Sequence, residues 1–233
     1  MQVIIPLAGP DFVSPDGAIK GLIPFQGKSL LKFVLDSRPW AHKVKHYVFV
    51  LYDCLESRQF ASNFLASWYK DSSFVFLTTF SQGAAMSALS GLSVLRAFSK
   101  PLIIDLADIY YQSNMDVENL LLTTQNIGAL GVVFTSDNPQ YSYLACDDYG
   151  VFVNAAEKKV ISDQASAGTY IFKSSAIFLQ SIAHAIENEH TQTYDNLFYV
   201  CPLFDGVRAQ GKQVALHPVG NIIDIKLDGL HEG

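Results

Sequence analysis

The chain has 233 residues, of which 49% are hydrophobic and 16% charged, with a formal net charge of −6. This composition excludes a disordered chain, and the acidic balance argues against nucleic-acid binding as the main function. Apolar runs fall well short of the roughly 18 residues that a membrane-spanning helix needs, and no basic leader precedes the first one, so we expect no membrane partner. Three scattered cysteines without a CxxC motif favour free thiols in a reducing compartment, and we expect a cytoplasmic protein.

Short apolar runs alternate with amphipathic stretches over the first 112 residues, a pattern typical of a parallel sheet with crossover helices. Runs that are apolar throughout favour strands buried on both faces. We expect such strands over residues 2–7, 47–52, 74–77 and 102–104. Helices are expected over residues 29–37, 55–69 and 84–98.

The pattern changes beyond residue 112, where strand signals follow one another with turn residues between them. We expect strands over residues 131–135, 142–145, 151–155, 168–172 and 214–218, and helices over residues 174–189 and 197–210. No linker separates the two halves. The prediction is one α/β domain over residues 1–233, a three-layer α/β/α structure with a mixed, mainly parallel central sheet, divided into halves at 1–112 and 113–233.

The stretch from Lys100 to Tyr111 holds a buried-strand pattern followed by two carboxylates, Asp105 and Asp108. Burying an unpaired carboxylate is costly, and ligands of open α/β sheets bind at the carboxyl ends of strands. Asp108 therefore suggests a ligand site, although capping of the next turn is an equally simple role for it.

Other familiar motifs are missing. The sequence has no GxGxxG, GxxxxGK[ST], HExxH or GxSxG, which removes support for dinucleotide, P-loop, zincin and hydrolase functions. His42 and His46 have helical spacing, but the neighbouring lysines favour a solvated surface over a metal site.

Six short motifs occur along the chain in a fixed order. They are the N-terminal segment with Leu7-Ala8-Gly9, Lys20 and Gly27-Lys28-Ser29, the turn at Gln82-Gly83-Ala84-Ala85, the strand that ends at Asp108, Glu157-Lys158, the strand from Ala167 to Phe172, and the segment from Asp224 to Asp228. In this order they resemble the nucleotide-sugar pyrophosphorylases, the sugar-phosphate nucleotidyltransferase family, over almost the whole chain. The resemblance implies the GT-A-type fold of nucleotide-diphospho-sugar transferases.

The chain departs from the family pattern in the first loop. That loop usually reads GxG(S/T)R, with an Arg that contacts the triphosphate, whereas here Gly9 is followed by Pro10, Asp11 and Phe12. The last motif also lacks its Thr-Pro. The chain is therefore identified as a divergent member.

The resemblance implies an enzyme that transfers a nucleoside monophosphate from a nucleoside triphosphate to a sugar 1-phosphate or a similar small phosphorylated metabolite, releasing pyrophosphate, in nucleotide-sugar and polysaccharide biosynthesis. It implies that Asp108 and Asp224 bind Mg²⁺ and, with Lys20, carry catalysis. By the same resemblance the nucleotide would be bound by Leu7, Ala8, Gly9, Lys20, Gln82 and Gly83, and the acceptor by Glu157, Lys158 and Gly168. Residues 1–112 would form the nucleotide side and residues 113–233 the acceptor side; a homo-oligomer stays open.

Two alternatives remain. The missing Arg is compatible with a protein that binds nucleotides or nucleotide-sugars without turning them over. A glycosyltransferase would share the nucleotide-binding half, but that class usually keeps an Asp-x-Asp pair. Asp105 and Asp108 are one residue too far apart for that pair, and we expect Asp105 to face the other side of the strand.

Overall fold

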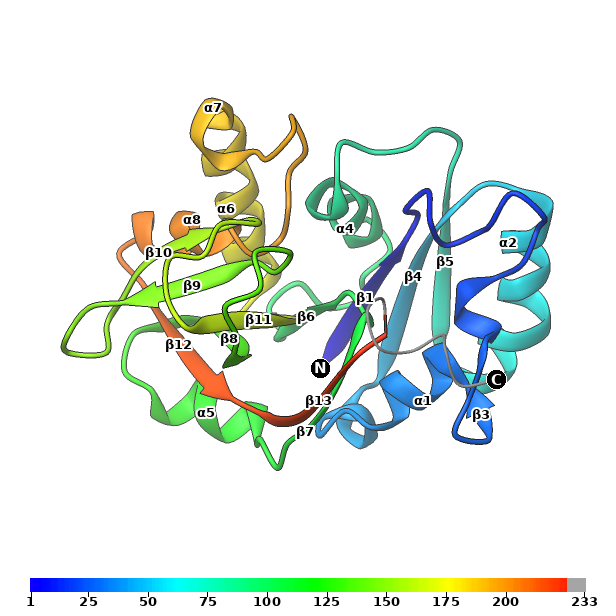
Figure 1. The fold of residues 1–233 in the computed structure, drawn as a ribbon, viewed down its shortest axis with the longest axis horizontal. Helices are drawn as coiled ribbons and strands as arrows, with labels where there is room; N and C mark the ends of the chain where they lie inside the picture. Colours follow the sequence, from blue (N-terminus) through cyan, green and yellow to red (C-terminus); the bar gives the residue numbers. More distant parts are fainter. Residues whose placement is uncertain (226–233) are drawn as a thin grey trace.

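The computed structural model describes residues 1–225, which form a nine-stranded mixed sheet flanked by helices (Figure 1). Its N-terminal half is parallel: β1 (Gln2–Leu7) lies between β4 (His46–Tyr52) and β6 (Leu102–Asp105), and β5 (Ser72–Leu77) continues the sheet beyond β4. The continuous apolar runs predicted this arrangement, since β1, β4 and β6 are almost entirely buried.

The C-terminal half of the sheet is built around one long strand, β11 (Gln164–Phe172), which pairs antiparallel with β6 and so joins the halves. Its other antiparallel partners are β8 (Ile127–Thr135) and β9 (Tyr143–Cys146). Beyond them, β10 (Phe152–Ala156) pairs with β9, and β12 (Gln213–Pro218) runs parallel to β8.

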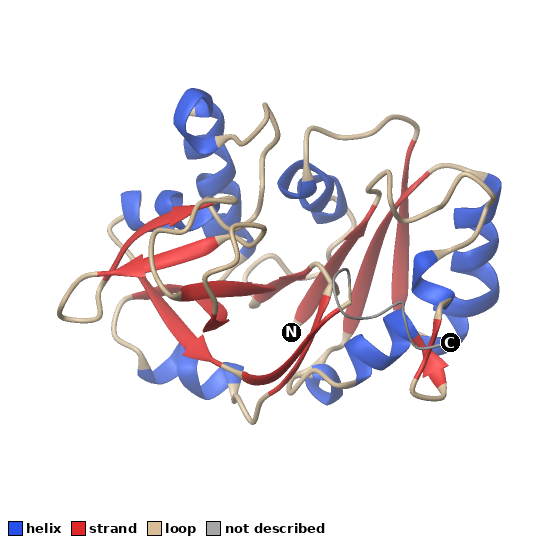
Figure 2. Ribbon diagram, in the orientation of Figure 1, coloured by secondary structure: helices blue, strands red, loops and turns tan. Residues whose placement is uncertain are grey.

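Helices cover both faces of the sheet, as Figure 2 shows. Side chains alternate along β1, so that Val3 and Ile5 face one apolar cluster while Ile4 faces the other. The first cluster includes side chains of α1 (Leu30–Asp36), α2 (Leu55–Phe60) and α5 (Val117–Thr123). The second includes side chains of α4 (Ala84–Leu92), α6 (Ser175–Glu187) and α8 (Leu203–Ala209). The predicted three-layer α/β fold with a mixed sheet is thereby confirmed.

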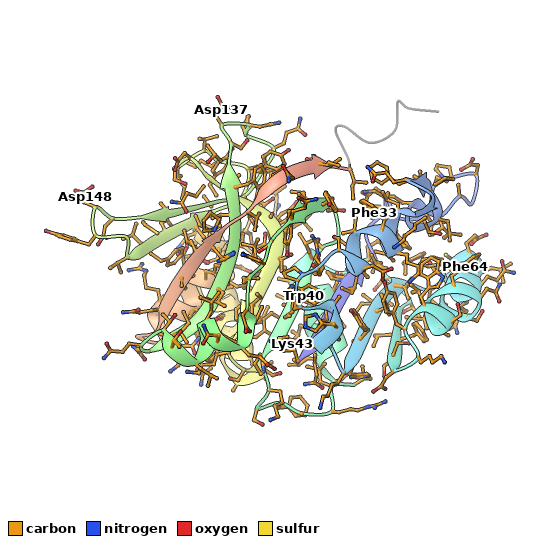
Figure 3. All side chains as sticks on the ribbon, turned by 90° about the horizontal axis from the view of Figure 1, so that it is seen from below. Phe33, Trp40, Lys43, Phe64, Asp137 and Asp148 are labelled. Atoms are coloured by element: carbon orange, nitrogen blue, oxygen red, sulfur yellow. The ribbon has the colours of Figure 1, made fainter. Side chains whose placement is uncertain are left out.

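Shorter elements complete the described part of the chain. They are η1 (Lys20–Leu22), β2 (Pro24–Phe25), β3 (Lys28–Ser29), η2 (Ala41–Lys43), the π-helical η3 (Ala61–Leu65), α3 (Ala66–Trp68), β7 (Ile109–Gln112), α7 (Glu189–Gln192) and β13 (Gly220–Asp224). Trp40, just before η2, is buried, whereas Asp148 lies at the tip of the β9–β10 hairpin (Figure 3). None of the helices in residues 1–225 is long and apolar enough to cross a membrane.

Several predictions of elements were wrong. The helix expected over residues 197–210 begins only at Leu203, because the preceding residues form a turn that packs against another loop. The chain also forms β7 and α5, which we did not predict. His46 is not a surface residue: it lies in β4, 2% exposed, with Nε2 2.9 Å from Ser73 Oγ. Asp228 lies outside the described residues.

Candidate functional site

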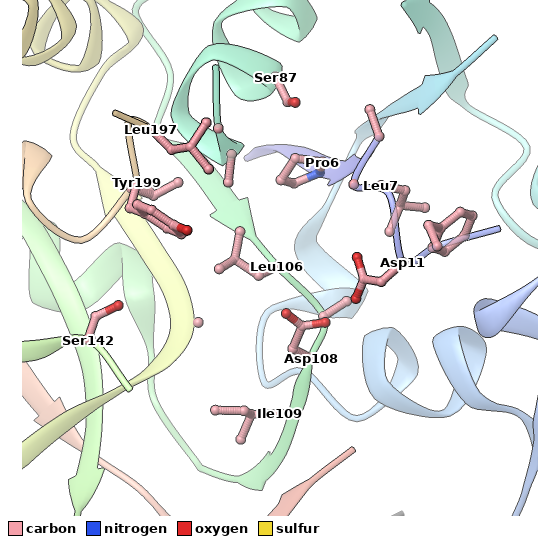
Figure 4. A pocket seen from close by; sticks show the side chains of 18 of the residues that line it. Pro6, Leu7, Asp11, Ser87, Leu106, Asp108, Ile109, Ser142, Leu197 and Tyr199 are labelled. Atoms are coloured by element: carbon pink, nitrogen blue, oxygen red, sulfur yellow. The ribbon is translucent and has the colours of Figure 1, made fainter. Parts of the chain in front are cut away.

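A cavity of about 410 Å³ opens between the two halves of the sheet, at the carboxyl ends of β1 and β6 (Figure 4). This size is typical of small-molecule sites. Residues from widely separated segments of both halves of the chain meet there. Of the predicted site residues, those that line it are Leu7, Ala8, Gly9, Lys20, Gly83, Asp108, Glu157, Lys158, Gly168 and Asp224. Gln82 does not line the cavity; its neighbours Ser81 and Gly83 do.

Two small residues, Ala8 and Gly9, line the cavity directly after β1. Ala8 is buried, and a tight turn follows, in which the amide of Phe12 donates to the carbonyl of Gly9 over 3.2 Å. A Cβ at Gly9 would lie 2.9 Å from Asp11 Oδ1, the end of a flexible and largely exposed side chain that can move aside. The small side chains leave main-chain amides and carbonyls accessible to a ligand.

Lys20 stands between two carboxylates. Its Nζ lies 3.5 Å from Asp11 Oδ2 and 3.6 Å from Asp108 Oδ1, and Figure 4 shows both carboxyl groups turned to the same part of the cavity. The Lys20 side chain is 20% exposed, against 64% for Asp11. Asp11 therefore offsets part of the charge that Lys20 brings to the site.

Asp108 and Asp224 come together through two short paired strands. β7 begins directly after Asp108 and pairs antiparallel with β13, which places Asp224 opposite Ile109. The amide of Ile225 also donates to the carbonyl of Asp108 over 3.1 Å. The residue pair that the sequence suggested as metal ligands thus occupies neighbouring positions on the cavity wall.

Asp108 and Asp224 by themselves supply only part of the ligands that a hard cation needs. Within residues 1–225 no group of three or more His, Cys, Asp or Glu side chains could hold a metal ion by itself. Mg²⁺, however, is commonly held by one or two carboxylates together with substrate phosphates and waters. Two carboxylates facing a cavity therefore fit Mg²⁺ arriving with a nucleotide better than a permanent metal centre.

Asp105, three residues before Asp108, points away from the cavity into a fully buried ion pair with Arg38. Arg38 Nε donates to Asp105 Oδ2 over 2.7 Å, and Nη2 donates to Oδ1 over 3.0 Å. Burial is the largest single influence and lowers the pKa of Arg38, but the charge of Asp105, its hydrogen bond to Arg38 and the nearby Tyr111 and Asp108 together outweigh burial and raise that pKa. The sequence predicted where Asp105 would face but gave no sign of its partner.

The turn at Ser81 to Gly83 is braced by a hairpin from the other half. The amide of Phe198 donates to the carbonyl of Gln82, and the amide of Ala85 donates to the carbonyl of Phe198, over 2.9 and 3.0 Å. Gly83 has φ +102°, and a Cβ there would lie 2.4 Å from the Phe198 carbonyl oxygen. Ser81 Oγ lies 2.6 Å from Ser87 Oγ, and both serines line the cavity.

Across the cavity, Lys158 lies beside two aromatic rings. Its Nζ is 5.2 Å from the ring centre of Tyr194 and 5.9 Å from that of Tyr199, distances at which a cation is attracted to a ring. Glu157 accepts a hydrogen bond from Ser142, and Ser142 and Tyr199 also line the cavity. Sequence reasoning missed both tyrosines, because they fall where it predicted a loop and a helix.

Gly168 lies where β11 departs from regular pairing with β8, between Ser166 and Tyr170. Its φ is +73°, and its carbonyl accepts from the amide of Leu106 over 2.9 Å. Ser166, Gly168 and Tyr170, which span this irregularity, all line the cavity. Burial raises the pKa of the nearby Tyr170 well above its usual value, so this phenol stays neutral and accepts a hydrogen bond from Ser166.

Comparison with known proteins gives structural likeness alone: no family model and no curated protein matches the sequence. A nucleoside-diphosphate-sugar pyrophosphorylase from Vibrio cholerae superimposes with a TM-score of 0.81 at 18% identity, covering 96% of this chain and 95% of that one. A protein assigned as a glucose-1-phosphate thymidylyltransferase from Bacillus anthracis, in complex with a sucrose, gives 0.71 at 14% identity, with 99% and 90% covered.

The inositol-1-phosphate CTP transferase from T. maritima gives a TM-score of 0.66 at 12% identity, covering 95% of this chain and 86% of that one. The resemblance inferred from the motifs is therefore confirmed at the level of the fold. At such low identities the likeness carries the architecture; the chemistry must be argued from the cavity itself.

Proposed function

We propose that this protein is a nucleotidyltransferase that couples a nucleoside triphosphate to a small phosphorylated acceptor of the sugar 1-phosphate type. The observation that carries the proposal is the meeting of ten predicted site residues around one cavity. These residues come from both halves of the chain.

The nucleoside would bind against the backbone of Ala8 and Gly9 and the turn at Ser81 to Gly83. Main-chain amides and carbonyls there offer both donors and acceptors to a base edge, and the hydroxyls of Ser81 and Ser87 lie beside them. Lys20 would then face the phosphates. As a compact, movable charge, its ammonium can exchange the Asp11 carboxylate for a phosphate oxygen.

The acceptor would bind on the opposite wall, where Lys158 faces its phosphate and Glu157 faces a hydroxyl or amine. An oxygen of that phosphate attacks the α-phosphorus of the donor. The bond from the α-phosphorus to the oxygen that bridges to the β-phosphorus breaks, and pyrophosphate leaves with the bonding electron pair. No covalent intermediate with the protein is needed, so the side chains act by positioning and by neutralising charge.

Asp108 and Asp224 would hold Mg²⁺ on the cavity wall between the donor and acceptor sides. When bound, the ion neutralises negative charge on the reacting phosphates and draws them together. The two carboxylates fix where it sits, and Lys20 next to Asp108 provides a second positive charge.

A pyrophosphate-release assay tests the proposal, with each common triphosphate offered against a panel of sugar 1-phosphates, inositol 1-phosphate and non-sugar phosphates, with and without Mg²⁺. We expect one triphosphate and one acceptor class to give Mg²⁺-dependent release. Release that needs no acceptor would indicate plain hydrolysis, and no release from any pair would contradict the proposal.

A binding protein without turnover is the second candidate, favoured by one observation: the loop that carries an Arg in the family has no Arg here, and its Asp11 contacts Lys20. Calorimetry separates the candidates, because such a protein would bind a nucleotide-sugar product tightly and bare triphosphates only at millimolar concentration. A glycosyltransferase lacks comparable support, because Asp105 is committed to Arg38 and leaves no carboxylate pair with Asp108.

A further inference from the structure

The ion pair of Arg38 and Asp105 is completely buried, since both side chains are 0% exposed. A comparable two-pronged pair on the surface, Arg58 with Asp53, has side chains 56% and 24% exposed. Replacing a buried ion pair by apolar side chains of similar volume is often neutral or even stabilising. Stability alone is therefore a poor reason for this chain to hold two charges in its core.

The contacts of the buried pair lie on both sides of Asp108 in the chain. The Asp105 carboxylate accepts a hydrogen bond from the amide of Ala107 over 2.7 Å. Arg38 Nη2 donates to the carbonyl of Ile109 over 3.0 Å. Asp108 thus lies between Ala107 and Ile109, whose backbone amide and carbonyl are hydrogen-bonded to the same ion pair.

The backbone at this point needs such support. Ala107 has φ +54°, in the left-handed region that a non-glycine residue adopts only where its surroundings impose it. The bond from the Ala107 amide to Asp105 closes the turn that turns Asp108 to the cavity while Asp105 points into the core.

The pair also reaches the other parts of the site. Thr169 Oγ1 donates to Asp105 Oδ2 over 3.1 Å and itself accepts from the Tyr111 hydroxyl over 3.0 Å. Thr169 directly follows Gly168 on the acceptor side. Ile109, whose carbonyl Arg38 holds, is the residue opposite Asp224. Both halves of the site therefore contact one buried charge pair.

We propose that Arg38 and Asp105 are positioning residues, which fix the backbone that presents Asp108 and Asp224 as a pair of divalent-cation ligands. The inference rests on the proposed function, because it takes these two carboxylates as the cation site. Outer groups that orient metal ligands typically contribute about 10- to 100-fold to metal affinity or activity, and we assign this pair an effect of that size.

The test compares two double variants in the full chain. Arg38→Met/Asp105→Leu removes the buried pair without leaving a lone charge, and Arg58→Met/Asp53→Leu removes the surface pair as a matched control. The first measurement is Mn²⁺ binding in the presence of a non-hydrolysable nucleoside triphosphate. It is read from the change in the electron paramagnetic resonance spectrum when protein is added to the ion–nucleotide complex. The second is backbone hydrogen exchange over residues 106–109.

We expect the buried-pair variant to keep its cooperative melting transition, to bind Mn²⁺ about 10- to 100-fold more weakly and to exchange faster over residues 106–109. The surface-pair variant should match the wild type in both measurements. A well-folded buried-pair variant with wild-type Mn²⁺ affinity and exchange would overturn the inference.

Should the double variant fail to fold, Thr169→Val decides instead, because it removes only the hydroxyl that contacts Asp105 and conserves the shape. We expect Mn²⁺ affinity to fall several-fold in this variant, and an unchanged affinity would overturn the inference. Failure of the proposed cation site is distinguishable, since the wild type itself would then not bind Mn²⁺, and the inference would fall with it.

Discussion

On the proposed donor side of the cavity, in residues 1–112, Ala8 and Gly9 follow the parallel strand β1 and Asp108 follows β6; Ala8 and Gly9 have little or no side chain and offer mainly backbone. On the acceptor side they stand at irregular positions. Lys158 has φ +50° in a loop after β10, and Gly168 sits at a break in the pairing of β11. There, neighbouring side chains fix the position of the site residues: Ser142 donates a hydrogen bond to Glu157, and two tyrosines flank Lys158.

The difference indicates where each kind of specificity resides. A wall made of main chain keeps its hydrogen-bonding groups whatever the nearby side chains are, so the donor side can tolerate a divergent loop sequence. A wall made of side chains changes its chemistry with each substitution. We therefore expect the nucleotide site to be the more general feature of this fold, and the acceptor to be set by residues particular to this chain.

Asp108→Asn should have the largest effect, because Asp108 lies where the two sides meet. Removing a charge that acts in the transition state typically costs about 10²–10³ in rate. We expect kcat to fall by that factor while the melting temperature changes little. Near wild-type turnover at saturating Mg²⁺ would show that Asp108 does not take part in catalysis.

Gly83→Ala tests the contact by which the acceptor half braces the donor turn. Its Cβ would meet the Phe198 carbonyl, and overpacking together with an unfavourable φ should cost about 2–4 kcal/mol in the free energy of unfolding. Gly150→Ala is the matched control: Gly150 also has a positive φ, of 77°, but open space around it. Equal losses for the two variants in urea unfolding would show that the Phe198 contact is unimportant.

Lys20→Ala and Lys158→Ala should separate the two sides kinetically. Each loses a charged contact worth about 1.5–3 kcal/mol, or roughly tenfold to a hundredfold. We expect the KM for the triphosphate to rise in the first variant and the KM for the acceptor in the second, with Lys159→Ala as the control. If both variants impaired both substrates equally, the division into donor and acceptor sides would be wrong.

Asp11→Asn should have the smallest effect and the opposite sign. Exposed ion pairs contribute about 0–1 kcal/mol, so releasing Lys20 from Asp11 should tighten triphosphate binding by up to about fivefold. Calorimetry measures the change, and Asp148→Asn, at the hairpin tip, is the control. Weaker triphosphate binding in Asp11→Asn would mean that Asp11 favours binding of the triphosphate and does not weaken it.

Much of the donor side could be predicted from the sequence, because buried parallel strands are continuous apolar runs and their ends mark the ligand edge. The acceptor side was harder. Leu197, Phe198 and Val200 have spacing that also suits a helix, and only the contacts of Phe198 with Gln82 and Ala85 decide against it. Tertiary contacts outweighed local propensity there.

The partner of Asp105 could not be predicted either. Arg38 is a single charged residue after a short helix, 67 positions away in sequence, and no periodicity connects the two. The predicted orientation of Asp105 was correct, whereas the reason for a carboxylate in the core became visible only once the fold brought Arg38 beside it. Charge pairs of this kind depend on the three-dimensional arrangement and leave no local pattern.

The pairing of β7 with β13 has a consequence for how the molecule is made. Asp224 reaches its place opposite Ile109 only when a very long loop of chain has closed, and such distant contacts form late in folding. During synthesis the parallel strands can assemble well before residue 224 has left the ribosome. Asp108 and Asp224 would thus meet only after the parallel strands have formed, so any activity that needs both carboxylates would appear last.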